Sequence, residues 1–110
     1  MTPLKLPTAA ADFIRDNSQA YAKAKAERCY LEQFRKSKKA LLMAESPEKT
    51  AASKEIYAYS HPDYVQLLEG LRLAIETEET LKWQLAAAEA KIEIWRTESA
   101  NNRQIDRSHR

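Results

Sequence analysis

The sequence predicts an all-α protein, an elongated antiparallel helical hairpin of two long helices with a short connecting helix, in a coiled-coil-like arrangement. One glycine and four prolines among 110 residues leave few turn-forming residues for a β-rich fold. Alanine, leucine, glutamate and lysine are frequent, and all four favour helices. Apolar residues also recur at alternating three- and four-residue spacing for several turns after Pro62.

The second long helix is predicted over residues 62–105. Ser60 and Asp63 have the spacing of a capping box, and Pro62 suits the first turn. Leucine, tyrosine, isoleucine and tryptophan dominate one seam of about five heptads. The members of this seam are Tyr64, Leu67, Leu71, Ala74, Glu78, Leu81, Leu85, Ala88, Ile92 and Trp95.

Two residues interrupt this apolar pattern. Glu78 is the one charge in the seam, and we expect it to specify register or to pair with Lys38 or Arg28 of another helix. Gly70 is the only glycine and costs on the order of 1 kcal/mol relative to alanine inside a helix. It is either a tolerated defect or the mark of a close crossing by the short helix, and we favour the crossing.

The first long helix is predicted over residues 8–45 and the short helix over 47–59. Ser46 would cap the short helix, with Pro47 in its first position. The first long helix has a seam that is only partly apolar, with Ile14, Tyr21 and Leu42 beside it. Its members are Phe13, Asn17, Ala20, Ala24, Glu27, Leu31, Phe34, Lys38 and Leu41.

We predict one helical domain over residues 8–107, between an extended N-terminal arm (1–7) and a frayed tail (108–110). A helix over 62–105 would extend roughly 60 Å at about 1.5 Å per residue. A compact domain of this size has a radius of gyration near ~13 Å. The helix is too long for such a domain, which is why an elongated hairpin is expected.

Charge is unevenly distributed, although the formal net charge is only +2. Residues 1–44 carry nine Lys/Arg and four Asp/Glu, whereas residues 45–110 carry nine and twelve. The first long helix, which is basic, would therefore lie along the second long helix, which is acidic. The small net charge does not by itself indicate nucleic-acid binding.

A second apolar stripe on the last helix predicts self-association. Leu73, Trp83, Ala87 and Ile94 recur at helical spacing, with Thr80 and Ala90 between them, on a face turned away from the seam. A helix in a two-helix hairpin needs one apolar face, so we expect this stripe to bind a second copy of the chain, with a dimer as the first guess. The alternative is that Trp83 packs under the first helix or is simply a surface residue.

The densest basic cluster contains Arg35, Lys36, Lys38 and Lys39. Three interpretations remain open: contact with an acidic partner protein, contact with nucleic acid through phosphates and nearby aromatic rings, or pairing with the acidic helix opposite. The aromatic residues in this part of the chain are Tyr21, Tyr30 and Phe34.

Catalytic, cofactor and metal-binding patterns are not found. There is no Glu-x-x-His pair, no Cys/His metal spacing and no glycine-rich phosphate loop. His61, at a helix start, is expected to cap or to be exposed. The lack of these motifs favours a non-enzymatic protein that binds no cofactor. A lone Cys29 favours a reducing compartment, and the lack of a long apolar run favours a cytoplasmic protein that spans no membrane.

The run from Tyr21 to Met43, followed by His61-Pro62-Asp63-Tyr64 and by Ile94-Trp95-Arg96-Thr97, resembles small helical proteins of tailed bacteriophages and prophages. The resemblance covers most of residues 20–107. It implies a protein of the infected bacterial cytoplasm, either an accessory to DNA recombination or replication or an inhibitor of a host factor. It supplies no functional residues.

Overall fold

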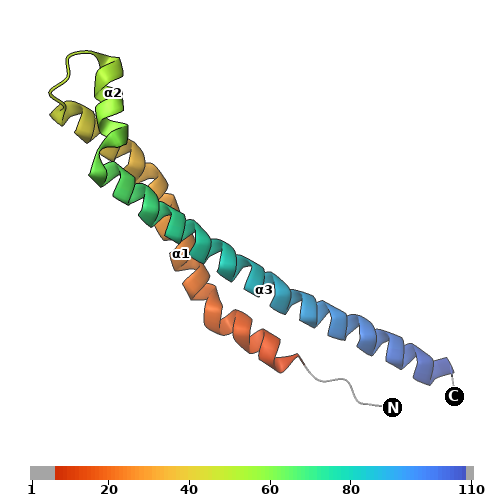
Figure 1. Ribbon diagram of the computed structural model, residues 1–110. Helices are drawn as coiled ribbons and strands as arrows, with labels where there is room; N and C mark the ends of the chain where they lie inside the picture. Colours follow the sequence, from red (N-terminus) through yellow and green to blue (C-terminus); the bar gives the residue numbers. More distant parts are fainter. Residues whose placement is uncertain (1–6, 109–110) are drawn as a thin grey trace. The chain divides into compact units, whose positions relative to one another are not determined.

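The computed structural model describes residues 7–108, and within this range it is built from three α-helices with no strand. The predicted all-α class is therefore confirmed. Figure 1 shows the helices in chain order, α1 (Thr8–Glu45), α2 (Ala51–Ser60) and α3 (Pro62–Ser108). Apart from Pro7, the predicted N-terminal arm lies outside the described residues. Of the predicted tail, Ser108 is the last residue of α3, and the rest lies outside the described range.

Contacts between residues divide the chain into two units, and each long helix contributes to both. Unit 1 contains the chain up to Tyr21 and from Thr80 onward, whereas unit 2 is Ala22–Glu79. The single helical domain predicted over residues 8–107 stays a prediction.

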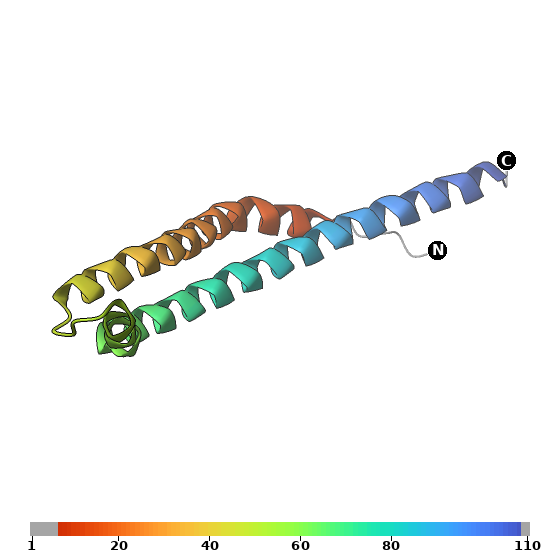
Figure 2. The ribbon, with the colours of Figure 1, turned by 90° about the horizontal axis from the view of Figure 1, so that it is seen from above.

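In unit 2, all three helices meet at a small apolar core. Leu42 of α1, Ala58 of α2 and Tyr64 of α3 are buried against one another, and Met43 packs beside them. Figure 2 shows the end of α1 and the start of α3 lying side by side next to α2. The α1 and α3 segments of this unit run antiparallel, so the hairpin expected from the sequence is present here.

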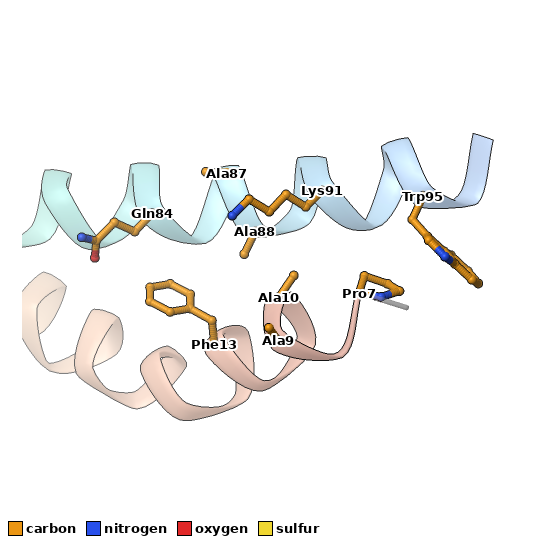
Figure 3. Close-up of a pocket in the computed structure, with 9 residues that line it drawn as sticks. All are labelled: Pro7, Ala9, Ala10, Phe13, Gln84, Ala87, Ala88, Lys91 and Trp95. Carbon is orange, nitrogen blue, oxygen red and sulfur yellow. The ribbon is translucent and has the colours of Figure 1, made fainter. Parts of the chain in front are cut away.

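In unit 1, α1 and α3 also face each other in antiparallel directions. Phe13 lies opposite Gln84, and Ala10 lies opposite Ala88 one turn farther along α3 (Figure 3). Both alanines are buried. Small side chains thus form the contact between the two helices at this level.

The seam predicted on α3 is confirmed along its whole length. Every one of its residues from Tyr64 to Trp95 is buried or half-buried, including the charged Glu78. Large apolar residues recur at three- and four-residue spacing on α3, so the sequence was sufficient to predict which face of this helix is buried.

The seam predicted on α1 is wrong at three of its nine positions, because Ala20, Glu27 and Leu41 are exposed. Leu41 is 55% exposed, whereas its neighbour Leu42 is 1% exposed. In the same way, Tyr21 and Arg28 are partly covered, while the predicted Ala20 and Glu27 are exposed. Positions 17, 24, 31 and 38 are covered as predicted, but after 17, 24 and 38 the next covered residue of the seam lies four positions on, where we predicted three. The buried face of α1 is therefore shifted there by one residue from the predicted one.

The start of α2 corrects a second prediction. The helix begins at Ala51 and is capped by Thr50, whose hydroxyl accepts a hydrogen bond from the Ser53 amide at 3.1 Å. Ser53 returns the contact, because its hydroxyl accepts from the Thr50 amide at 3.3 Å. Ser46 accepts only from the Glu48 amide, in a turn before the helix. The reciprocal Thr50–Ser53 pair satisfies two amides and so determines the helix start.

The start of α3 also differs from the predicted capping box. Ser60 is the last residue of α2, and its hydroxyl donates back to the Ile56 carbonyl at 2.6 Å. The amide of Asp63 instead donates to Nδ1 of His61 at 3.1 Å. The imidazole thus caps α3, which agrees with the capping role expected of His61.

Gly70 is not a crossing point. A Cβ atom built on Gly70 would meet no atom within 4 Å, so no helix approaches closely there. The prediction of a close crossing by the short helix is therefore wrong, and the glycine is a tolerated defect in α3.

Candidate interaction surfaces

A partly buried ion pair fixes the pairing of α1 with α3 in unit 2. The guanidinium of Arg28 donates two hydrogen bonds to the Glu78 carboxylate, at 2.6 and 2.8 Å, and a third to Glu32 at 3.1 Å. These hydrogen bonds, with Glu78 first, raise the pKa of Arg28 above its usual value. Of the two partners expected for Glu78, Arg28 is the one it meets, so this residue has a structural role.

The predicted basic cluster is partly neutralised by carboxylates of unit 2. Lys38 lies 3.7 Å from the Asp63 carboxylate, and Lys39 donates to Glu55 at 3.0 Å. The Lys39 ammonium also lies 4.7 Å from the centre of the Tyr59 ring. Contact with Tyr59 first and Glu55 second raises the pKa of Lys39. Half of the cluster therefore serves the packing of α1 against α2 and α3.

The other half of the cluster opens into a surface hollow. Arg35 and Lys36 form no ion pair or hydrogen bond with another residue that the structure describes. Together with Lys39 they line a hollow of about 420 Å³, whose remaining walls are Tyr59 and Tyr64. The hollow brings residues of all three helices together, and it places three cationic groups beside the exposed ring of Tyr59 and the largely buried Tyr64.

The aromatic residues that the sequence placed near the cluster are not part of this hollow. Tyr30 stacks on Phe34 with ring centres 5.8 Å apart, but neither lines the hollow. At about 100° per residue, these two side chains emerge on a different side of α1 from Lys36 and Lys39. Tyr59 and Tyr64 take the aromatic role instead, and they come from α2 and α3.

The four residues predicted for self-association are all exposed. In unit 1, Trp83 is 65% exposed and Ile94 is 57% exposed, with Ala87 on the same side of α3. The Lys82 ammonium lies 5.6 Å from the centre of the Trp83 ring. Leu73, which belongs to unit 2, is 56% exposed. Packing under α1 is therefore not the role of Trp83.

Unit 1 also contains an apolar groove of about 550 Å³ that the sequence analysis did not predict. Its floor consists of alanines from both helices, and Phe13 and Trp95 lie toward its two ends (Figure 3). The indole N–H of Trp95 is buried and has no hydrogen-bond partner among the described residues. The groove thus combines an apolar floor with one unused donor.

The sequence did contain a signal for this groove. Ala10 on α1 lies opposite Ala88 on α3, with Ala9 and Ala87 next to them in the chain, so small residues coincide on the two helices at this level. This coincidence becomes visible only once the register of the two helices is known. Trp95 was correctly assigned to the seam, but its position at the end of a groove could not be inferred.

Two other kinds of site are not found within residues 7–108. No group of three or more His, Cys, Asp or Glu side chains is arranged to hold a metal ion in this range. None of the helices described there has both the length and the apolar character that a membrane crossing needs. Cys29 is exposed and forms no disulfide within the described residues.

Comparison with models of protein families, with curated proteins and with solved structures gives no match to this chain.

Proposed function

We propose that this protein is a non-enzymatic helical interaction protein that self-associates and binds or inhibits a partner protein. The observation that carries the proposal is the exposure of Trp83 and Ile94 on the outer side of α3. Two large apolar side chains in one unit, at helical spacing and on one side, favour contact with another helix. Tryptophan is also among the residues that contribute most to protein–protein binding energy.

A second copy of the chain is the occupant we propose for this side of α3. The other side of the helix is already used by the seam, and only seven apolar residues of the described chain are buried, four of them alanines. Pairing through Trp83, Ala87 and Ile94 of unit 1 would remove large apolar groups from water. A dimer is the simplest assembly that does so.

Sedimentation equilibrium over a wide range of protein concentration tests this proposal. We expect a dimer that dissociates on dilution, and a weaker dimer for the Trp83→Gln/Ile94→Gln variant. A matched control is Leu41→Gln/Ile56→Gln, which changes two equally exposed apolar residues of unit 2. A monomer at every concentration, or equal weakening by both variants, would overturn the proposal.

For the partner protein, we propose contact through the basic cluster, of which Arg35 and Lys36 are the cations left without a described partner. The charge balance of unit 2 favours a contact confined to the hollow over one that extends along the unit. Residues 22–79 carry ten Lys/Arg and ten Asp/Glu, so the unit has no excess positive charge to follow an extended polyanion. An acidic group on a folded partner needs only the few cations at the hollow.

The second candidate function is a nucleic-acid-binding accessory factor. The hollow lined by three cations and two tyrosines supports it, because phosphates and bases would find both kinds of contact there. This function requires binding that weakens steeply with salt and a smaller salt dependence after neutralisation of Lys36 and Lys39. Lack of DNA and RNA binding at low salt would exclude it.

From the resemblance to phage and prophage proteins, we propose that either function is exercised in the cytoplasm of an infected bacterium. The inhibitor of a host factor is then one form of the first function, and the accessory to DNA recombination or replication is the second. A pull-down from bacterial lysate, with and without nuclease, separates them. Retention of a protein after nuclease treatment supports the first, and its loss supports the second.

A further inference from the structure

The basic hollow of unit 2 is matched in charge to one particular anion. Arg35, Lys36 and Lys39 line it, and Glu55 neutralises one of these cations by its 3.0 Å contact with Lys39. Two positive charges therefore remain. Lys38 does not change this balance, because it lies beside Asp63.

Different anionic groups would satisfy this excess to different degrees. A phosphate monoester carries about −1.5 to −2 at pH 7 and presents three acceptor oxygens. A carboxylate carries a single negative charge, as does each phosphodiester of a nucleic-acid backbone. Only the monoester neutralises both remaining cations while occupying one position.

The donors in the hollow also suit a monoester. The guanidinium of Arg35 offers a planar fork that binds two phosphate oxygens together, and the Lys36 ammonium adds a charge that is free to turn toward the third. Lys39 is held in place by Glu55 and by the ring of Tyr59, so one cation is already oriented before any ligand arrives.

The size and walls of the hollow indicate more than a bare ion. A volume of about 420 Å³ leaves room for the group that carries the phosphate. Tyr59 is partly exposed and meets Tyr64 edge to face, with ring centres 5.3 Å apart, which keeps the Tyr59 ring in position. An aromatic or other flat group attached to the phosphate would rest against this wall.

We propose that the basic hollow between α1, α2 and α3 of unit 2 binds a phosphate monoester carried on an aromatic or similarly flat group. The proposal rests on the proposed role of the basic cluster as the partner contact, and it names the chemical group that the cluster recognises. It does not depend on self-association through α3.

Calorimetric titration with phenyl phosphate tests this inference, with benzoate as the carboxylate of similar shape. We expect phenyl phosphate to bind at least about fivefold more tightly than benzoate, because it neutralises one more cation. Equal affinities, or no binding of phenyl phosphate, would overturn the proposal. A single-stranded oligonucleotide that binds more tightly than phenyl phosphate would overturn it in favour of a phosphodiester contact.

Variants then locate the site. Arg35→Gln/Lys36→Gln should weaken phenyl phosphate binding by about tenfold or more, since it removes both cations that have no described partner. Lys23→Gln/Lys25→Gln removes the same charge from exposed positions on the same helix and should leave the affinity unchanged. Equal losses in the two variants would overturn the site. Lys36→Gln alone, at an exposed position, tests the same point should the double variant lose helix content by circular dichroism.

Two sources of the monoester are distinguished by a peptide that contains phosphotyrosine. Tighter binding of this peptide than of phenyl phosphate indicates a phosphorylated partner protein, whereas equal binding indicates a small phosphate ester. Both results support the monoester site. Failure of all phosphate monoesters to bind, alongside an intact dimer and a captured protein partner, would reject this inference alone and leave the proposed function standing.

Discussion

Arg28 of α1 holds the carboxylate of Glu78 of α3 with two hydrogen bonds, and the two residues differ in how far they are buried. Glu78 is 7% exposed, whereas Arg28 keeps more contact with water and a second acidic partner in Glu32. Loss of Arg28 would therefore leave a buried carboxylate without its main partner, while loss of Glu78 would leave a cation that still reaches water and Glu32. The pair is asymmetric.

This asymmetry predicts different costs for the two deletions. Arg28→Met should lower the free energy of unfolding by about 2 kcal/mol or more, because the Glu78 carboxylate stays buried without a guanidinium. Glu78→Leu should cost less, and Arg28→Met/Glu78→Leu should recover most of the loss. Urea unfolding measures all three variants. A double variant no more stable than Arg28→Met would contradict this account of the pair.

A second prediction tests the corrected seam of α1. Leu42→Ala should cost about 2–4 kcal/mol, since it empties the space where the three helices of unit 2 meet. Leu41→Ala, one residue earlier and largely exposed, should change the stability by no more than about 0.5 kcal/mol. Midpoints of urea unfolding would show the difference. Equal effects of the two substitutions would contradict the burial of Leu42 in place of Leu41.

The contrast between the two long helices explains how much of the fold was predictable. On α3, large apolar residues alternate with charges, so one face was clearly the seam. On α1, Leu41 and Leu42 are adjacent, and small or polar residues fill most other positions, so the apolar pattern did not distinguish between two faces one residue apart. Contacts with α2, through Ala58 and Tyr59, decide between them, and a sequence pattern within α1 contains no information on those contacts.

The candidate surfaces were predictable to a similar degree. Exposure of Trp83 and Ile94 followed from the period of α3 alone. The basic hollow did not, because its tyrosines come from α2 and α3 while its cations come from α1. Pairing of Lys38 with Asp63 and of Lys39 with Glu55 was likewise beyond a reading of separate helices. Local patterns identified the charges, and only the packing of the helices showed which of them remain available.

Gly70 gives a third prediction. With open space around the position of a Cβ atom, Gly70→Ala should stabilise the protein by about 0.5–1 kcal/mol through the higher helix propensity of alanine. The reverse change at an exposed position of α1, Ala26→Gly, should destabilise it by a similar amount. Thermal unfolding of both variants checks the pair. A destabilised Gly70→Ala protein would show that a neighbouring segment does approach this position.

The last prediction concerns the start of α3, where His61 has the role that the sequence suggested for Ser60. Nδ1 of His61 accepts the Asp63 amide, which would otherwise lack a partner in the first turn of the helix. His61→Ala should therefore lower the free energy of unfolding by about 1 kcal/mol, the usual effect of losing an N-terminal cap. His61→Asn should recover much of this loss, because its side-chain oxygen can accept from the same amide. Ser60→Ala should have a smaller effect, since the Ser60 hydroxyl bonds only to carbonyls within α2. Unfolding in urea near neutral pH measures all three variants, and a larger loss for Ser60→Ala than for His61→Ala would identify Ser60 as the functional cap.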